Sequence, residues 1–338
     1  MSLLHRAALS IALASAIGAN GCASIPGRNP SSVSIWLAPM PGAPGGGAFL
    51  SGQSPNDFEI GETISIDTVS FRPDLVRPAY PPLIVNPNRS GAMAQRFAIV
   101  TTFQGARYHP ETIRALGEDT IALASVAGAI AREANNRGVH SVVADFQGLS
   151  QSDLTGLLAT LRALNDSARR NVPGMLRVIV PPGDTVAYPT KPIAAIARTI
   201  VVRLYGEHRP GTAPGALASP EWINRQLGLR AVDAGVNRLM AELPMFGYLW
   251  QRDGSARSIS FAEASRIVSA ESSTFRRDQP TGFLTATGRD GWSIWVPDAQ
   301  TVERMIGVVQ RAGVSSVMLT GMDGADPALW TRLPALRR

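Results

Sequence analysis

The sequence predicts an α/β fold, a (β/α)8 TIM barrel with a small α+β insertion between its seventh and eighth strands. Three observations favour this fold: eight short, almost continuously apolar runs, helical segments between most of them, and a length of 338 residues. Strands of this kind are typical of a parallel sheet that is buried on both faces. The chain has no glycine-rich phosphate loop that would favour an open doubly wound sheet.

The strands and helices alternate along the chain. Helical residues from Thr120 to Arg137 end at Gly138, and glycine is favoured just after a helix. After the fourth strand, leucines recur at helical spacing at positions 154, 157, 158, 161 and 164. The eight predicted strands lie at residues 32–40, 63–71, 96–103, 139–147, 175–182, 198–205, 237–248 and 315–320.

The insertion is predicted at about residues 251–297, on the C-terminal face of the barrel. Ser260 and Glu263 have the spacing of a capping box, which marks the start of a helix. Residues 283–295 then alternate across Asp290 and Gly291 like a β-hairpin. The barrel as a whole is expected at residues 33–332, followed by a basic tail at 333–338.

The N-terminus has the features of an export signal. Arg6 precedes an apolar run from Ala7 to Ala19, which is too short and too weakly hydrophobic for a stable membrane span. Cys22 is the only cysteine, and residues 19–22 resemble a bacterial lipoprotein processing site, with Ala19 where leucine is usual. We therefore expect a signal peptide at 1–22, a lipidated Cys22 that tethers the protein to a membrane, and a tether at 23–32. The alternative is ordinary signal cleavage nearby, which leaves a free thiol.

The expected location is the bacterial cell envelope. Ala23 rather than aspartate after Cys22 fits an outer-membrane lipoprotein of a Gram-negative cell, and a periplasmic or secreted protein is the alternative. The formal charge of +6 and the pI near 10.2 depend on arginine, because Lys191 is the only lysine. No basic run with interleaved aromatic residues is present, so we expect no nucleic-acid partner.

Six segments carry a resemblance to a known family: "VHSVVADFQ" (139–147), "LYGEHRPGTAPGALASPEW" (204–222), "ELPMFGYLW" (242–250), "ISFAEA" (259–264), "WSIWVPDAQTV" (292–302) and "GVSSVMLTGMDGADPALW" (313–330). They resemble segments of glycoside hydrolase family 18, the chitinase-like barrels whose fourth strand ends in DxxDxDxE. The likeness is greatest to the bacterial branch that contains spore-cortex and peptidoglycan hydrolases and barrels fused to polysaccharide deacetylases. It extends from about residue 96 to 330.

The resemblance implies roles for three residues. In the family a glutamate protonates the glycosidic oxygen, and an aspartate two residues earlier holds the substrate acetamido group that attacks the anomeric carbon. Asp145 matches this aspartate and Tyr205 matches the tyrosine that steadies the acetamido group. Gln147 occupies the position of the acid, and an amide cannot supply the proton.

Three further positions depart from the family pattern. Val143 replaces a polar residue that supports the catalytic pair, Gly206 replaces an aspartate, and Thr320 replaces the tryptophan beneath the bound sugar. Glu207 and His208 are retained. Together with Tyr248, Trp250 and Thr320, they are the residues that the resemblance places at the substrate.

Structural roles remain open for the same residues. Asp145 can cap a helix or pair with an arginine, Gln147 can be a rim residue, and Glu207 with His208 can form a loop clasp. Trp222, Trp250 and Trp330 are also candidates for packing rather than sugar contact, whereas Trp292 or Trp295 can face a glycan. No cofactor is implied, and no further histidine or cysteine stands at metal-ligand spacing.

The expected function is binding of an N-acetylhexosamine-containing polysaccharide or oligosaccharide, chitin-like or peptidoglycan-like, with impaired hydrolysis. One alternative is an active glycoside hydrolase in which Glu207 or Asp145 serves as the acid. The other is a non-catalytic protein-interaction scaffold whose cleft is closed.

Overall fold

The computed structural model describes residues 33–39, 58–66, 77–78 and 96–336. The chain divides into two units, Met1–Pro30 and Ser31–Arg338, and all described residues belong to the second. The predicted signal peptide, Cys22 and the tether at 23–32 therefore lie outside the described residues. The predictions for those segments stay predictions.

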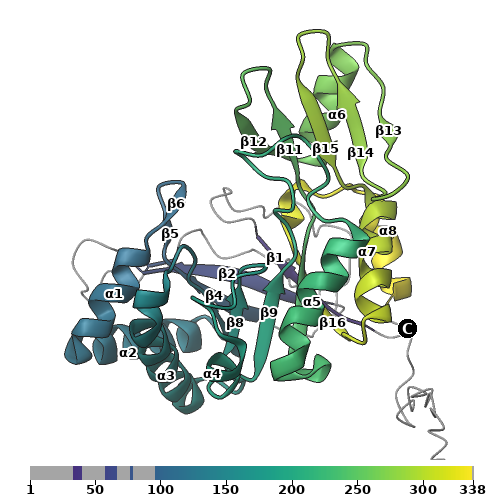
Figure 1. The fold of residues 1–338 in the computed structure, drawn as a ribbon. Coiled ribbons are helices and arrows are strands. Elements are labelled where there is room, and N and C mark those ends of the chain that lie inside the picture. The colour runs from purple at the N-terminus through teal and green to yellow at the C-terminus, as the bar shows by residue number, and fades with distance from the viewer. Residues whose placement is uncertain (1–32, 40–57, 67–76, 79–95, 337–338) are drawn as a thin grey trace, which may run out of the picture. The chain divides into compact units, whose positions relative to one another are not determined.

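Eight parallel strands form a closed barrel, as predicted (Figure 1). The barrel closes because β1 pairs in parallel with both β16 and β2. In chain order its strands are β1 (Ser34–Ala38), β2 (Glu59–Ser65), β4 (Arg96–Thr101), β7 (Ser141–Asp145), β8 (Arg177–Val180), β9 (Thr199–Arg203), β10 (Leu239–Pro244) and β16 (Ser316–Thr320).

The second strand begins earlier than predicted. It was expected at 63–71, but β2 starts at Glu59, and residues 67–71 lie outside the described part of the chain. Glu59 and Glu62 break the apolar pattern of this segment. They are accommodated because Glu59 pairs with His140, and Glu62 pairs with Arg96 and Arg137. A strand that carries paired carboxylates gives little apolar signal in the sequence.

Helices cover the outside of the barrel (Figure 1). As predicted, α2 ends where Gly138 adopts a positive φ of 65°, and Leu157, Leu161 and Leu164 of α3 are buried. The helices of the barrel are α1 (Pro110–Glu118), α2 (Thr120–Asn136), α3 (Leu154–Asn171), α4 (Thr190–Ala194), α5 (Pro220–Ala234), α7 (Ala299–Arg311) and α8 (Leu329–Leu336). Helix α8 extends past the expected barrel end at 332, and its Leu333 is fully buried.

The barrel interior is filled by a separate apolar cluster. Side chains alternate along each strand, so Val143, Val201, Met240 and Met318 point inward while their neighbours pack against the helices. The Trp36 ring lies in this cluster, 4.6 Å from the Phe97 ring between centroids. The interior is thus a packed apolar core.

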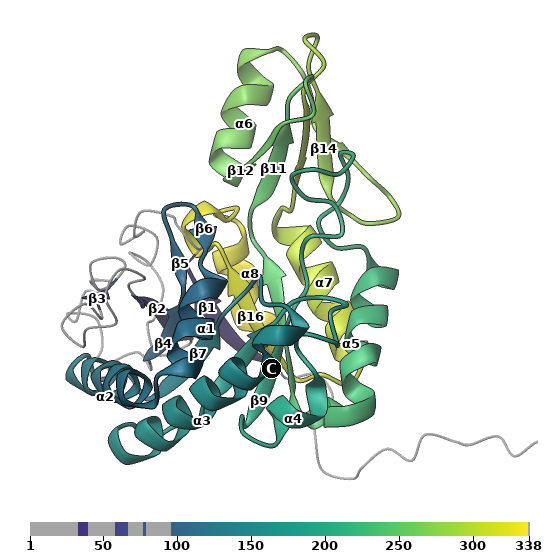
Figure 2. The ribbon, with the colours of Figure 1, turned by 60° about the vertical axis from the view of Figure 1, so that its left-hand side comes forward.

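The insertion is a five-stranded antiparallel sheet with one helix, placed between β10 and β16 as predicted (Figures 1 and 2). Its strands β14 and β15 pair across the turn at Gly291, which has a φ of 83°. Ser260 caps α6 by accepting a hydrogen bond from the Glu263 backbone, whereas the Glu263 carboxylate pairs with Arg257. The elements are β11 (Gly247–Trp250), β12 (Ala256–Ile259), α6 (Phe261–Ala270), β13 (Arg276–Arg277), β14 (Leu284–Thr287) and β15 (Ser293–Val296).

Short elements complete the described chain: β3 (Arg77–Pro78) beside β2, a hairpin of β5 (Phe103–Gln104) and β6 (Arg107–Tyr108), and the 3-10 turns η4 (Gln151–Asp153), η5 (Val236–Arg238) and η6 (Met322–Gly324). None of the helices in the described ranges is long and apolar enough to span a bilayer.

The loop after β7 is held by two sets of hydrogen bonds. Tyr188 Oη donates to the carbonyl of Phe146 at 2.9 Å and accepts from the backbone of Leu149 at 3.0 Å. Asp153 accepts from the backbone and hydroxyl of Ser150 at 2.9 and 2.7 Å, and from Arg114 Nε at 2.8 Å. Because Gln147 lies between these contacts, its backbone is fixed from both sides.

We predict that Asp153→Asn destabilises the protein by about 1–2 kcal/mol at pH 7. The hydrogen bond from Arg114 outweighs the opposing effect of burial and, with those from Ser150, lowers the pKa of Asp153 from 3.8 to about 2. A lowered folded-state pKa contributes stability above the unfolded pKa, and this contribution is lost as the pH falls through the folded value. Urea unfolding of both proteins should therefore converge between about pH 4 and pH 2.

The matched control is Asp166→Asn, which changes an exposed carboxylate within α3. It should leave the stability unchanged over the same pH range. An equal effect of both variants would show that the Asp153 contacts do not stabilise this loop.

Candidate functional site

A layer of buried polar side chains lies at the C-terminal ends of four barrel strands. The alternation that sends Val143, Val201, Met240 and Met318 into the apolar interior places Asp145, Arg203, Glu242 and Thr320 one step higher, at the mouth of the barrel. All four are at most 8% exposed. In this fold, side chains at these strand ends form the site.

Arg203 is the centre of this layer. Its Nε donates to Glu242 Oε2 at 2.9 Å, its Nη2 donates to Asp145 Oδ2 at 3.0 Å, and its Nη1 donates to Tyr108 Oη at 3.1 Å. Tyr108 in turn donates to Asp145 Oδ2 at 2.8 Å. One guanidinium thus joins two carboxylates from different strands, and the three charges sum to one negative charge.

The surroundings shift the pKa values of three members of this network. Burial alone would lower the pKa of Arg203, but the carboxylates of Asp145 and Glu242 raise it well above its ordinary value. Burial raises the pKa of Tyr108 and of Tyr205 well above 10, against the opposing effect of Arg203. Both phenols therefore stay protonated and act as donors, and Arg203 stays charged at any physiological pH.

Gln147 points into the network rather than away from it. Its Nε2 donates to Asp145 Oδ1 at 2.8 Å and to the carbonyl of Ile179 at 3.3 Å, and the residue is 7% exposed. Both partners are acceptors, so only the NH2 group of the amide fits this orientation. Asp145 does pair with an arginine, and both of its oxygens act as acceptors, for Tyr108, Arg203 and Gln147.

The other two polar members are bound to Glu242. Thr320 Oγ1 donates to Glu242 Oε1 at 2.8 Å, and Tyr205 Oη donates to the same oxygen at 3.2 Å. The Tyr205 ring also lies edge-on to Phe246, with 5.3 Å between centroids. Asp145, Gln147, Tyr205 and Thr320 are thus brought into one cluster.

Glu207 and His208 lie outside this cluster and fasten their own loop. Both carboxylate oxygens of Glu207 accept from Ser219, one from its backbone at 2.6 Å and one from its hydroxyl at 2.9 Å. His208 Nδ1 lies 2.9 Å from the carbonyl of Ala213. These contacts form a clasp at the start of α5, which is the structural role that the sequence left open. That the two residues contact substrate stays a prediction.

Trp250 has the packing role that the sequence left open. It is 1% exposed, and its Nε1 donates to the carbonyl of Thr212 at 3.1 Å. A ring without an exposed face cannot stack on a sugar, so Trp250 is a packing residue. Tyr248 and its cross-strand neighbour Trp295 remain partly exposed on one face of the insertion sheet.

Gly206 follows Tyr205, at the position where the resemblance leads one to expect an aspartate. Its φ is 108°, a conformation that L side chains rarely adopt, and its backbone donates to the carbonyl of Leu217. The backbone here has a path that an aspartate would strain. Val143 is likewise adapted to its place, fully buried in the apolar interior below Asp145.

Three members of the network were missed in the sequence: Arg203, Glu242 and Tyr108. A signal for two of them was present, because Arg203 in "TIVVRLY" and Glu242 in "LMAELP" are single charges near the ends of apolar strands. Buried charges are rare unless they are paired. Tyr108 is separated from Asp145 by 37 residues and had no comparable signal.

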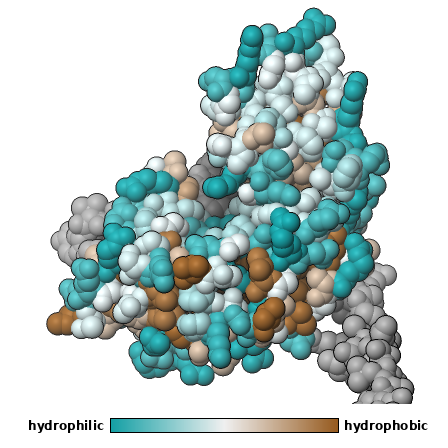
Figure 3. Space-filling model, in the orientation of Figure 1, coloured by the Kyte–Doolittle hydropathy of each residue, from teal (hydrophilic) through white to brown (hydrophobic). Residues whose placement is uncertain are grey.

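The described side chains at the surface near the β5–β6 hairpin and on the insertion are mostly hydrophilic in the view shown (Figure 3). Within the described ranges, no three His, Cys, Asp or Glu side chains are grouped to hold a metal ion. The arrangement offers hydroxyl, amide and carboxylate groups, which suit hydrogen bonding to a polar ligand.

We predict that Arg203→Met destabilises the protein by about 3–5 kcal/mol, because it leaves the Asp145 and Glu242 carboxylates buried without their cation. Urea unfolding measures this loss. Adding Glu242→Gln should restore part of it, since one uncompensated charge is removed.

Arg257→Met is the control, because its pair with Glu263 has a half-exposed guanidinium. It should cost less than about 1 kcal/mol. Equal losses in the two arginine variants would show that the central ion pairs do not stabilise the site.

Comparison with known proteins gives one consistent result. No protein-family model matches the chain. A curated relative, the "Uncharacterized glycosylase YvbX" of Bacillus subtilis, is 22% identical over 144 residues, which are 41% of this chain and 42% of that protein. The match thus spans less than half of the relative's length.

Solved structures match over most of the chain. The spore cortex-lytic enzyme SleL of Bacillus cereus aligns with a TM-score of 0.76 and 14% identity over 91% of this chain and 75% of that chain. A chitinase of Chromobacterium violaceum aligns with a TM-score of 0.73 and 18% identity over 90% and 99%. A GH18 chitinase of Cycas revoluta in complex with (GlcNAc)3 aligns with a TM-score of 0.70 and 15% identity over 90% and 99%. The chain therefore has the chitinase-like barrel fold of glycoside hydrolase family 18.

Proposed function

We propose that the protein binds an N-acetylhexosamine-containing glycan, chitin-like or peptidoglycan-like, at the mouth of the barrel, and that its hydrolytic activity is impaired. The observation that carries this proposal is the hydrogen bond from the Gln147 amide to Asp145. At the position where the family has its acid, this chain donates a hydrogen bond that cannot become a proton transfer. General-acid catalysis typically contributes about 10²- to 10⁴-fold in rate.

The geometry supports binding because the hydrogen-bonding groups are kept. Asp145 and Tyr205 remain at the mouth, and both are held by several contacts that fix their positions. A related fold is known with (GlcNAc)3 bound. A scaffold with a closed cleft is the rival interpretation, and the binding experiment below separates the two.

An active hydrolase with a different acid is the second rival. Glu242 is the observation in its favour, since this carboxylate lies in the same cluster as Asp145. Its oxygens, however, already accept from Arg203, Tyr205 and Thr320. Glu207, the acid considered from the sequence, is bound to Ser219. Neither carboxylate is poised to protonate a leaving group.

The location in the cell is part of the proposal. We propose an exported lipoprotein of the bacterial envelope, held through acyl chains on Cys22, with the outer membrane as its site. Only the sequence of residues 1–23 supports this part.

We predict that Gln147→Glu creates hydrolytic activity without loss of binding. The new carboxyl would lie against Asp145, and two carboxyls at hydrogen-bond distance cannot both be ionised, so one keeps a proton. Wild type should bind chitooligosaccharides or peptidoglycan fragments in calorimetry without product release above the background of the assay. The variant should release product about 10²- to 10⁴-fold faster than this background.

The control is Gln147→Glu combined with Asp145→Asn, which should bind but lose the gained activity. Product release by wild type would show that another residue serves as the acid, and it would favour the active hydrolase. Absence of binding by both proteins would favour the scaffold.

We predict that the expressed full-length chain incorporates labelled palmitate and that Cys22→Ser abolishes the incorporation. The physical reason is that lipid transfer needs the thiol of this residue, which is the only cysteine in the chain. An unlabelled wild-type protein released in soluble form would show ordinary signal cleavage instead.

A further inference from the structure

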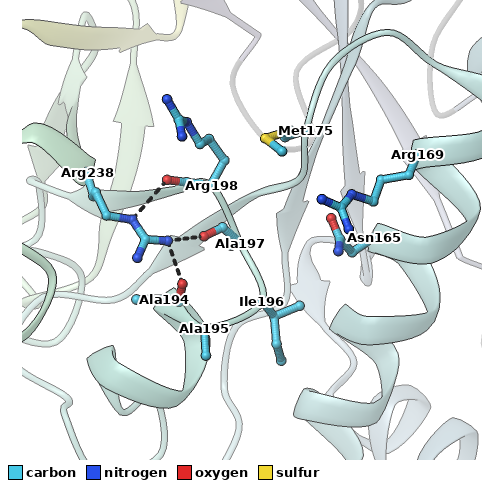
Figure 4. A pocket seen from close by; sticks show the side chains of 9 residues that line it. All are labelled: Asn165, Arg169, Met175, Ala194, Ala195, Ile196, Ala197, Arg198 and Arg238. Carbon is cyan, nitrogen blue, oxygen red and sulfur yellow. Dashed lines mark hydrogen bonds between the residues drawn. The ribbon is translucent and has the colours of Figure 1, made fainter.

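A hollow of about 240 Å³ lies at the N-terminal end of the barrel strands, opposite the polar layer (Figure 4). Its lining comes from segments that lead into β8, β9 and β10, and from α3. Arginine contributes three of its side chains, Arg169, Arg198 and Arg238. This end of the barrel plays no part in the site described above.

Arg238 is fixed at the wall of the hollow. Its Nη2 donates to the carbonyls of Ala194 and Ala197 at 2.5 Å each, and its Nε donates to the carbonyl of Arg198 at 3.3 Å (Figure 4). These carbonyls belong to the end of α4 and the residues after it. Arg238 thus orders the loop while keeping a positive charge in place.

Arg169 and Arg198 are exposed and come from α3 and from the residue before β9. Within the described part of the chain, no carboxylate lies within ion-pair distance of these two or of Arg238. Met175, which is 41% exposed, adds an apolar side chain to the same lining. Guanidinium groups without an ion-pair partner can bind the anionic groups of a surface, and an exposed methionine beside them can contact its apolar interior.

The chain enters the barrel at this same end. Val33 precedes β1, and the Ser34 backbone donates to the carbonyl of Ser315, just before β16. Cys22 stands 11 residues before Val33, and a fully extended chain of that length spans at most about 40 Å. A lipid on Cys22 would therefore keep the N-terminal end of the barrel close to the bilayer.

We infer that this end of the barrel docks on an anionic phospholipid surface, with Arg169 and Arg198 contacting lipid phosphates around the hollow. Guanidinium groups bind phosphate in a bidentate manner, and each arginine close to an anionic bilayer strengthens binding about fivefold. The inference rests on the envelope location in the proposed function. It places the barrel mouth on the side away from the membrane, where a glycan is accessible.

The test uses the protein from Ser31 to Arg338, which holds the compact unit and lacks the lipid anchor. Co-sedimentation compares vesicles of phosphatidylcholine alone with vesicles that also contain phosphatidylglycerol. We expect binding to the anionic vesicles only, weakening as salt rises. Arg169→Gln with Arg198→Gln should reduce it about 25-fold.

The matched control is Arg252→Gln with Arg289→Gln, which neutralises two exposed arginines of the insertion. It should leave vesicle binding unchanged. Three results would each overturn the docking surface. They are an equal loss of vesicle binding in both double variants, equal binding to neutral and anionic vesicles, and competition with vesicle binding by millimolar glycerol phosphate. Glycan binding, measured on the same proteins, should be unaffected by either double variant. If the protein without substitutions binds glycan but not anionic vesicles, the docking surface alone is rejected. If it binds anionic vesicles but no glycan, the proposed glycan function is rejected.

Discussion

The guanidinium of Arg203 is the constraint on which the mouth of the barrel depends. Two carboxylates from β7 and β10 are buried there, and each would be costly without a cation within hydrogen-bond distance. Because Arg203 reaches both, the polar layer can rest directly on an apolar interior. The same contact holds Asp145 Oδ2 and leaves only its other oxygen, which faces Gln147. One side chain thus sets both the charge and the orientation of the residues that a ligand would meet.

The departures from the family pattern form a consistent set in this structure. Val143 belongs to the apolar interior, Thr320 is bonded to Glu242, Gly206 uses a backbone conformation available to glycine, and Gln147 donates to Asp145. Each of these four residues has packing neighbours, a hydrogen-bond partner or a backbone conformation that suits its position. A site that had merely lost catalytic groups would leave buried polar atoms unpaired at the mouth. Here the groups are paired, which supports the binding role proposed above.

Much of the fold could be predicted because strands buried on both faces leave long apolar runs, and because helix ends and turns carry glycine and serine signals. The early start of β2 could not be predicted, because Glu59 and Glu62 interrupt the apolar pattern and their partners are not evident from the sequence. The site was predictable only along the strand that carries Asp145 and Gln147. Arg203, Glu242 and Tyr108 join it through contacts between residues far apart in the chain, and the burial of Trp250 depends on a loop that approaches from β9.

The closure of the barrel by β1 has a consequence for the order of folding. The first strand must pair with β16, whose residues come nearly 300 positions later, before the sheet has no open edge. Until Ser316–Thr320 has been made, β1 and β10 keep unpaired edges, and contacts this distant form slowly. Half-made chains therefore expose strand edges that can pair with other chains. The chain must avoid such pairing for as long as its last barrel strand is missing.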